Sequence, residues 1–179
     1  EAVVDDMGYK GNPINMVGLN LRLTEIQAGF GRLLLKKLPN IISKWRENAN
    51  YLESKINNIP FLEMPTVASG ATHSYYVHTI KFNKEKADGV NRNDYVDAVI
   101  AELEPYELRE AEGVQMGAGY IKPLYLQSLY QERKGIYQDI WAQSDVSYKK
   151  GICPVAERMH EKEVITHEFI RSCLSNSDI

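Results

Sequence analysis

The sequence has little of what a membrane protein, a disulfide scaffold or a nucleic-acid binder needs. No apolar run approaches the roughly 18 residues that a membrane-spanning helix requires, and the first residues do not resemble a signal peptide. The two cysteines, Cys153 and Cys173, lack metal-type spacing and form no disulfide framework. A formal net charge of -3 offers no basic surface for nucleic acid. We therefore expect a cytoplasmic protein that binds neither membranes nor nucleic acids.

Histidine is present, but its spacing does not form a metal motif. His160 and His167 lie seven residues apart with glutamates nearby, whereas the His-Glu-x-x-His pattern places two histidines on one helix face. Polar side chains around a helix-to-strand turn account for this cluster, so we predict no metal site. No serine or cysteine has a recognisable nucleophile context, and spacing alone cannot nominate a catalytic triad.

The composition is that of a folded domain. Of the 179 residues, 44% are hydrophobic and 25% are charged, which suits the packed core of one domain or slightly more. The chain begins at Glu1 rather than Met, and it ends with SNSDI, whose serines could cap a helix that does not follow. We expect the chain to be a segment of a longer protein.

A long amphipathic pattern begins near Thr24. Thr24 followed by Gln27 matches a capping box, and apolar residues then recur at steps of three and four. Pro39 cannot donate a backbone hydrogen bond, and its ring clashes with the preceding turn. The pattern therefore predicts two helices, at about 24–37 and 39–58, in one connecting segment that kinks at the proline.

Two segments have the composition of strands. Residues 73–82, HSYYVHTIKF, are rich in β-branched and aromatic residues, and residues 163–169, EVITHEF, are similar. We expect these two strands to pair.

Short helices are expected around these strands. Asn93 can cap a helix at about 94–103, one or two turns follow Pro123, and Pro154 suits the first turn of a helix to about Lys162. Because the strands do not alternate with helices as in a doubly wound sheet, we predict an α+β fold with a small antiparallel sheet.

The residues just before the first helix are suited to an anion. In GLNLRLTEIQAGFGRLLLKKL, residues 18–38, Asn20 and Arg22 precede the Thr24 cap. A helix N-terminus has free N–H groups and a partial positive charge, and amide and guanidinium groups donate to phosphate oxygens. Asn20 and Arg22 are therefore candidate phosphate ligands. The alternative, a turn residue and a surface charge, stays open.

Five blocks occur in the order EAVVDDMG, GLNLRLTEIQAGFGRLLLKKLP, HSYYVHTIKF, GYIKPLYLQSLYQ and CPVAERMHEKEVITHEFIR. Together they resemble the DegT/DnrJ/EryC1/StrS family of pyridoxal-phosphate (PLP) dependent sugar aminotransferases, over essentially the whole chain. The resemblance implies the C-terminal small domain of an aspartate aminotransferase-like (fold type I) enzyme. Residues 1–23 would lead from the large domain, 24–58 would form the connecting helix, and 59–179 the small α+β domain.

The resemblance also implies a role for the opening motif. Family members are typically homodimers with active sites at the subunit interface. The asparagine of their G-x-N-x-R segment reaches the PLP phosphate of the neighbouring subunit, and Asn20 occupies that place. Arg22 matches the arginine of the motif, as a second phosphate ligand or as a brace for the loop.

Further residues match segments that lie near the sugar in this family. His73 and Tyr76 belong to the strand that passes near the substrate, and Tyr120, Lys122 and Tyr125 belong to a loop that resembles a substrate-proximal one. Structural packing is the alternative for all five.

The family's Schiff-base lysine belongs to a glycine-rich segment upstream of Glu1, so no catalytic residue is assigned in this chain. The implied parent enzyme moves an amino group, usually from glutamate, to a nucleotide-linked keto-sugar. A PLP-dependent sugar dehydratase of the same family and a non-catalytic binding or assembly module are the alternatives. Without a large domain, an apolar stripe on residues 24–58 would be exposed and would favour self-association.

Overall fold

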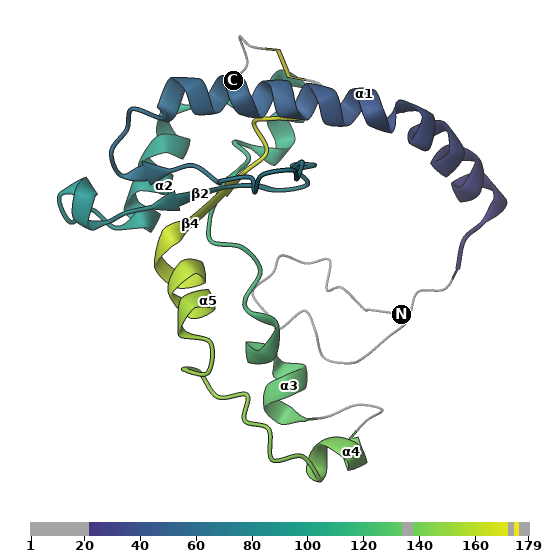
Figure 1. Cartoon of the computed structure of the whole chain (residues 1–179), viewed down its shortest axis with the longest axis vertical. Helices are drawn as coiled ribbons and strands as arrows, with labels where there is room; N and C mark the ends of the chain where they lie inside the picture. Colours follow the sequence, from purple (N-terminus) through teal and green to yellow (C-terminus); the bar gives the residue numbers. More distant parts are fainter. Residues whose placement is uncertain (1–21, 134–137, 172–173, 176–179) are drawn as a thin grey trace. The chain divides into compact units, whose positions relative to one another are not determined.

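The computed structural model describes residues 22–133, 138–171 and 174–175 (Figure 1). The chain divides into two compact units. Unit 1 comprises residues 1–25 and 121–158, and unit 2 comprises residues 26–120 and 159–179. Asn20, a predicted phosphate ligand, lies outside the described residues.

Helix α1 (Glu25–Ile56) begins directly after Thr24, which therefore occupies the N-cap position. The helix is continuous with Pro39 inside it, so the prediction of two separate helices is wrong. Pro39 deprives the Leu35 carbonyl of its usual donor. Both residues are exposed, so water can supply the missing hydrogen bond and the helix continues.

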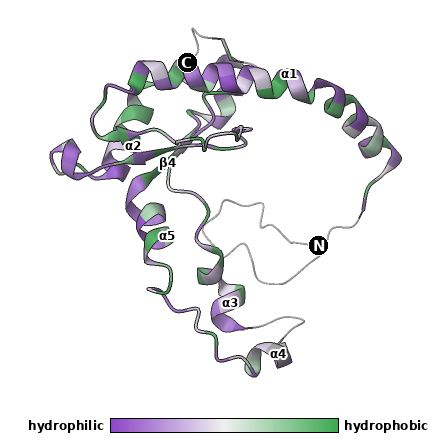
Figure 2. Cartoon of the chain, in the orientation of Figure 1, coloured by the Kyte–Doolittle hydropathy of each residue, from purple (hydrophilic) through white to green (hydrophobic). Residues whose placement is uncertain are grey.

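The two halves of α1 have different surroundings. Its N-terminal half exposes large apolar side chains, which we call the apolar stripe: Ile26, Phe30, Leu33, Leu34 and Leu38. Its C-terminal half buries Asn48, Ala49 and Leu52. Figure 2 shows apolar and polar residues alternating along the helix. The exposed apolar stripe expected over residues 24–58 is therefore found only in the N-terminal half of α1.

Four short strands form one antiparallel sheet in the order β1-β2-β4-β3. They are β1 (Leu62–Glu63), β2 (His78–Phe82), β3 (Met116–Ala118) and β4 (Val164–His167). β2 pairs with β4, with His78 opposite His167 and Ile80 opposite Ile165. The predicted pairing and the α+β class with a small antiparallel sheet are both confirmed.

The observed strands differ from the predicted ones in length. β2 is shorter than the predicted strand at 73–82, because Tyr75 adopts a left-handed backbone conformation with φ 52° and residues 73–77 lie outside the ladder. β1 and β3 have two and three residues. Such short strands carry no alternation of polar and apolar residues from which a sequence could reveal them.

Helix α2 (Arg92–Glu102) begins two residues before the predicted start, with Asn91 rather than Asn93 at the N-cap. The Asn93 side chain is engaged elsewhere, because its Oδ1 accepts hydrogen bonds from Arg92 Nε and Nη2 at 3.0 and 2.9 Å. Asn91 instead donates from Nδ2 to Asp94 at 3.1 Å.

The core of unit 2 consists of two clusters. Buried residues from the sheet and α2 form the larger one: Leu62, Ile80, Phe82, Ala87, Val96 and Ile165. The smaller one joins the C-terminal half of α1 to the segments that flank the sheet: Ala49, Leu52, Tyr75 and Ile170. Full burial of a side chain such as Phe82 contributes about 1.5–3 kcal/mol, so these clusters hold α1 and α2 to the sheet.

A buried arginine fixes the entry to β4. Arg92 is 5% exposed, and its guanidinium donates to the carbonyls of His160 (2.9 Å), Glu161 (2.9 Å) and Val164 (2.7 Å). These carbonyls belong to the π-helical turn η4 (Met159–Glu163) and the first residue of β4. A π-helical turn leaves carbonyls without their usual α-helical donors, and Arg92 supplies donors to them.

Unit 1 contains the short helices η3 (Leu124–Leu126), α3 (Ser128–Glu132), α4 (Gln138–Ala142) and α5 (Pro154–Arg158). The turns predicted after Pro123 and the helix predicted from Pro154 are confirmed. Arg133 organises the loop after α4 by donating to the carbonyls of Ser144 (2.9 Å) and Val146 (2.5 Å).

Among the described residues, no helix is both long and apolar enough to cross a membrane.

Candidate functional site

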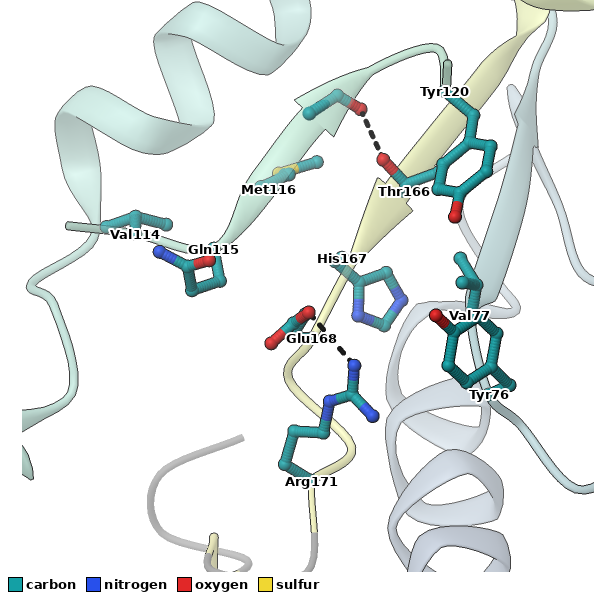
Figure 3. Close-up of a pocket in the computed structure, with 11 residues that line it drawn as sticks. Tyr76, Val77, Val114, Gln115, Met116, Tyr120, Thr166, His167, Glu168 and Arg171 are labelled. Atoms are coloured by element: carbon teal, nitrogen blue, oxygen red, sulfur yellow. Dashed lines mark hydrogen bonds and ion pairs between the residues drawn. The ribbon is translucent and has the colours of Figure 1, made fainter. Parts of the chain in front are cut away.

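A pocket of about 390 Å³ opens beside β3 and β4 in unit 2 (Figure 3). Its size lies within the range of roughly 300–1,000 Å³ that is common for small-molecule sites. Three segments line it: the residues just before β2, the residues around β3, and β4 with the turn that follows. The polar and aromatic side chains among them are Tyr76, Gln115, Tyr120, Thr166, His167, Glu168 and Arg171.

Two exposed tyrosines contribute to the wall. Tyr76 and Tyr120 are 72% and 54% exposed, and each follows a residue with positive φ. Tyr75 (φ 52°) is buried, and its amide donates to His73 Nδ1 at 2.7 Å, which turns the chain before Tyr76. Gly119 (φ 87°) precedes Tyr120. The pocket thus receives two aromatic faces and two phenol hydroxyls.

Glu168 anchors the opposite side of the pocket. It accepts hydrogen bonds from Arg109 Nη1 at 2.5 Å and from Arg171 Nη2 at 2.9 Å. The bond from Arg171, followed by that from Arg109, holds the pKa of Glu168 below its ordinary value. Arg109 also donates to Glu112, and the two carboxylates raise the pKa of Arg109. Glu168 and both arginines are therefore charged at neutral pH and hold one another in place.

The sheet places its polar side chains toward this pocket by simple alternation. Ile165 and His167 are buried, at 0% and 4% exposure. Thr166, which lies between them, and Glu168, which follows them, are half-buried. Thr166 Oγ1 donates to the Gly119 carbonyl at 2.9 Å, which ties the end of β3 to β4.

The structure brings together two of the predicted substrate residues, Tyr76 and Tyr120. His73 does not line this pocket. It is exposed, its Nδ1 accepts the bond from the Tyr75 amide, and its carbonyl accepts one from Arg46 Nε at 2.7 Å. His73 therefore holds the turn before Tyr76, and its expected position near the substrate stays a prediction.

The other predicted residues belong to unit 1. Lys122 is exposed, and its carbonyl accepts a hydrogen bond from Gln127 Nε2 at 2.8 Å. Tyr125 is half-buried and donates its hydroxyl hydrogen to Glu157. Burial and this carboxylate raise the pKa of Tyr125 to about 12, so it remains protonated. Arg22 is exposed just before α1.

Metal-ligating side chains do not converge in the part of the chain that the structure describes: no group of three or more His, Cys, Asp or Glu side chains there could hold an ion. Nε2 of His167, one of the two histidines of the sequence cluster, instead lies 2.6 Å from Nδ1 of His78.

Sequence reasoning missed Gln115, Thr166, Glu168 and Arg171 as pocket residues. Glu168 and Arg171 have the three-residue spacing of a short-range ion pair, which was a usable signal. Gln115 and Thr166 gave none, because only the pairing of β3 with β4 brings their segments together.

Residues 3–168 match the family model for the DegT/DnrJ/EryC1/StrS aminotransferase family. This match spans most of the 179 residues, and the chain therefore belongs to that family.

Two curated relatives align with most of the chain. The uncharacterized protein MJ1066 of Methanocaldococcus jannaschii is 24% identical over 147 residues, which is 82% of this chain and 32% of the relative. The spore coat polysaccharide biosynthesis protein SpsC of Bacillus subtilis is 22% identical over 163 residues, 90% of this chain and 39% of the relative. The chain thus spans only about a third to two fifths of the length of these proteins.

Solved structures share the fold. DesV from S. venezuelae superposes with a TM-score of 0.62 at 18% identity, covering 88% of this chain and 34% of that one. A DegT DnrJ EryC1 StrS aminotransferase from Brucella abortus gives a TM-score of 0.58 at 19% identity, covering 99% of this chain and 38% of that one.

Proposed function

We propose that the chain is the C-terminal part of a PLP-dependent nucleotide-sugar aminotransferase, which transfers an amino group, usually from glutamate, to a keto-sugar. Family membership supports the reaction class. A relative named for spore coat polysaccharide biosynthesis supports a sugar substrate. The structural observation that carries the proposal is the meeting of Tyr76 and Tyr120 in one pocket, since both belong to segments expected near the sugar.

The pocket has side chains suited to a sugar. The faces of Tyr76 and Tyr120 provide apolar contact for a sugar ring, and their hydroxyls donate and accept hydrogen bonds. Glu168 and Arg171, held by their ion pair, offer a fixed acceptor and donor across the pocket. In this proposal the pocket is the sugar-side wall of the active site.

PLP requires a lysine for its Schiff base and supplies the electron sink for amino transfer. Among the described residues, no lysine lines this pocket or a cavity of about 400 Å³ around Arg109 in unit 2. The proposed contribution of this chain is therefore at the phosphate, where Asn20 and Arg22 would donate to a cofactor bound by the neighbouring subunit of a homodimer.

A non-catalytic assembly module is the second candidate. The exposed apolar stripe of α1 favours it, because contiguous exposed apolar surface often marks a protein–protein contact.

The first experiment is to sequence the coding DNA upstream of Glu1. A lysine in a glycine-rich segment a few tens of residues before Glu1 would support the aminotransferase. A histidine in that place would instead indicate a PLP-dependent sugar dehydratase of the same family. A reading frame that starts at or just before Glu1 would remove the cofactor domain and leave the assembly module.

The sugar-side wall can be tested with the chain itself. We expect UDP-N-acetylglucosamine to shift the backbone amide resonances of Gly117, Tyr120 and Thr166 in a ¹⁵N NMR titration. Tyr120→Ala should weaken this binding about tenfold, which corresponds to 1.4 kcal/mol. Tyr51→Ala, on α1 and outside the pocket, is the matched control. Equal affinities for both variants would contradict the assignment of the pocket.

A further inference from the structure

A chain of ionisable side chains begins at His167, on the wall of the pocket, and has no role in the proposed function. His78 on β2 and His167 on β4 are 1% and 4% exposed and face each other across the strand pair. His78 Nδ1 lies 2.6 Å from His167 Nε2. His78 Nε2 lies 3.0 Å from Oε1 of Glu53 on α1. The chain therefore connects the two central strands of the sheet to the long helix.

The far end of this chain is a backbone amide. The N–H of Phe169 donates to His167 Nδ1 at 3.2 Å. An amide can only donate, so His167 Nδ1 carries no hydrogen, and the hydrogen of the neutral ring is on Nε2. This Nε2–H donates to His78 Nδ1, which leaves the His78 hydrogen on Nε2, where it points at the Glu53 carboxylate.

All the hydrogen bonds in the chain thus run in one direction, from the Phe169 amide to Glu53. The opposite direction fails at both ends. It would place an N–H of His167 against the Phe169 N–H, and a bare nitrogen of His78 against the Glu53 carboxylate. Because the amide and the carboxylate are fixed in their roles, both histidines are neutral and both are Nε2–H tautomers.

An additional proton on either ring breaks this arrangement. A proton on His78 Nδ1 faces the Nε2–H of His167, and a proton on His167 Nδ1 faces the N–H of Phe169. Two donors then oppose each other in a buried site, which costs the free energy of unsatisfied buried groups. We propose that Glu53, His78 and His167 form a pH-sensitive contact that holds α1 to the sheet and opens when an imidazole gains a proton.

The surroundings of the pair favour its neutral form. The ring of Tyr75, in the segment before β2, lies 5.4 Å from that of His78, and the ring of Phe169 lies stacked 4.9 Å from that of His167. Burial, together with the smaller effect of the neighbouring His78, lowers the pKa of His167 to about 3.

The charged groups around His78 act in opposite directions. Burial lowers the pKa of His78, and this effect exceeds the opposing effect of the Glu53 carboxylate. His73, in the segment before β2, lowers the pKa of His78 as well. Arg46, on α1, is a further charged group near Tyr75.

The sign of the pH dependence follows from these shifts. In the opened state both imidazoles return to an ordinary pKa of about 6.5. Between about pH 6.5 and the lower pKa values of the closed state, the opened state binds more protons. The contact is therefore strongest above pH 6.5 and weakens as the pH falls.

The tautomers can be tested directly on the whole chain. Long-range ¹H–¹⁵N correlation spectra distinguish Nδ1–H, Nε2–H and doubly protonated imidazoles. At pH 6.5 we expect His78 and His167 both to be neutral Nε2–H tautomers. An Nδ1–H tautomer or an imidazolium at either position would overturn the proposal. This measurement needs no substitution and hence no variant that must fold.

A second experiment measures the protons that opening takes up. Trp45 on α1 packs against the smaller core cluster. Its fluorescence reports release of the helix once the other tryptophan is removed by Trp141→Phe. Urea titrations followed by its fluorescence between pH 7 and pH 5 give the opening constant. Each imidazole that gains a proton on opening raises this constant about tenfold per pH unit well below its free pKa.

The variants separate this role from simple packing. The slope of the logarithm of the opening constant against pH gives the number of protons taken up on opening. We expect this number to approach two in the parent chain and to be one lower in His167→Gln, whatever the absolute stability of the variant. His160→Gln, which replaces a histidine outside the chain, should keep the parent slope. An unchanged slope in His167→Gln would overturn the proposal. Neither experiment involves PLP or a sugar, so its result is independent of the proposed enzymatic function.

Discussion

At the scale of single residues, Gly119 determines how β3 can approach the π-helical turn before β4. It has φ 87°, and a Cβ atom at this position would lie 2.7 Å from the His160 carbonyl oxygen. That oxygen also accepts a hydrogen bond from Arg92. The glycine therefore permits both the turn that presents Tyr120 and the contact that Arg92 stabilises.

This role predicts a large effect for Gly119→Ala. We expect a loss of about 3 kcal/mol in the free energy of unfolding, because the backbone conformation and the contact with a carbonyl both disfavour a side chain. Gly89→Ala is the matched control, with φ 83° and open space around the Cβ position. It should lose only about 1 kcal/mol. Urea denaturation measures both, and equal losses would show that the contact with His160 is unimportant.

The family resemblance, rather than local chemistry, nominated the substrate residues, and their contact with a substrate stays a prediction. Tyr76 and Tyr120 were predicted as substrate residues from the family resemblance, and the structure places both in one pocket. His73 was predicted with them, yet its ring accepts a bond from the Tyr75 amide. That bond depends on the left-handed conformation of Tyr75, which no periodic pattern indicates, since a bulky residue rarely adopts it.

At the scale of elements, α1 shows how context decides the effect of a proline. Pro39 predicts a break because it removes a hydrogen bond and crowds the preceding turn. The helix nevertheless continues from Glu25 to Ile56. Its C-terminal half is held by buried residues, and the carbonyl that loses its donor faces water.

Pro39→Ala should therefore stabilise the N-terminal half of α1. Alanine is favoured over proline by about 3 kcal/mol in a helix interior, and it restores the donor to the Leu35 carbonyl. We expect slower amide hydrogen exchange across residues 26–38 and stronger helical circular dichroism. Lys36→Ala, in the same exposed half, should change neither by a comparable amount. Unaltered exchange in Pro39→Ala would mean that the proline does not weaken the helix.

The strands also differ in how far the sequence predicts them. The segments that became β2 and β4 were found from their β-branched and aromatic residues, and their pairing was expected correctly. β1 and β3 were missed because two or three residues carry no pattern. β3 pairs only with β4, so its existence depends on a partner distant in sequence.

At the scale of the whole molecule, the apolar stripe of α1 is the feature with the clearest consequence. All five large apolar side chains of this stripe are exposed, and so is Leu35 beside them. Burying them would be favourable by about 25 cal/mol per Å² of apolar surface. The chain should therefore self-associate at high concentration.

Phe30→Ser combined with Leu34→Ser tests this expectation. The double variant removes two members of the apolar stripe and should shift the oligomer population toward monomer in sedimentation equilibrium. Arg32→Ser, on the same turn of α1, is the control and should leave association unchanged. A parent chain that stays monomeric at high concentration would contradict the prediction.

The sequence by itself determined the fold class, the amphipathic helical segment that became α1, the pairing of its two main strands and the family resemblance, because each of these depends on local pattern or on ordered motifs. Only the tertiary structure decided the walls of the pocket and the one-directional chain from Phe169 through His167 and His78 to Glu53. These features join residues that lie far apart in sequence. The register of the strands and the position of α1 bring them within hydrogen-bond distance.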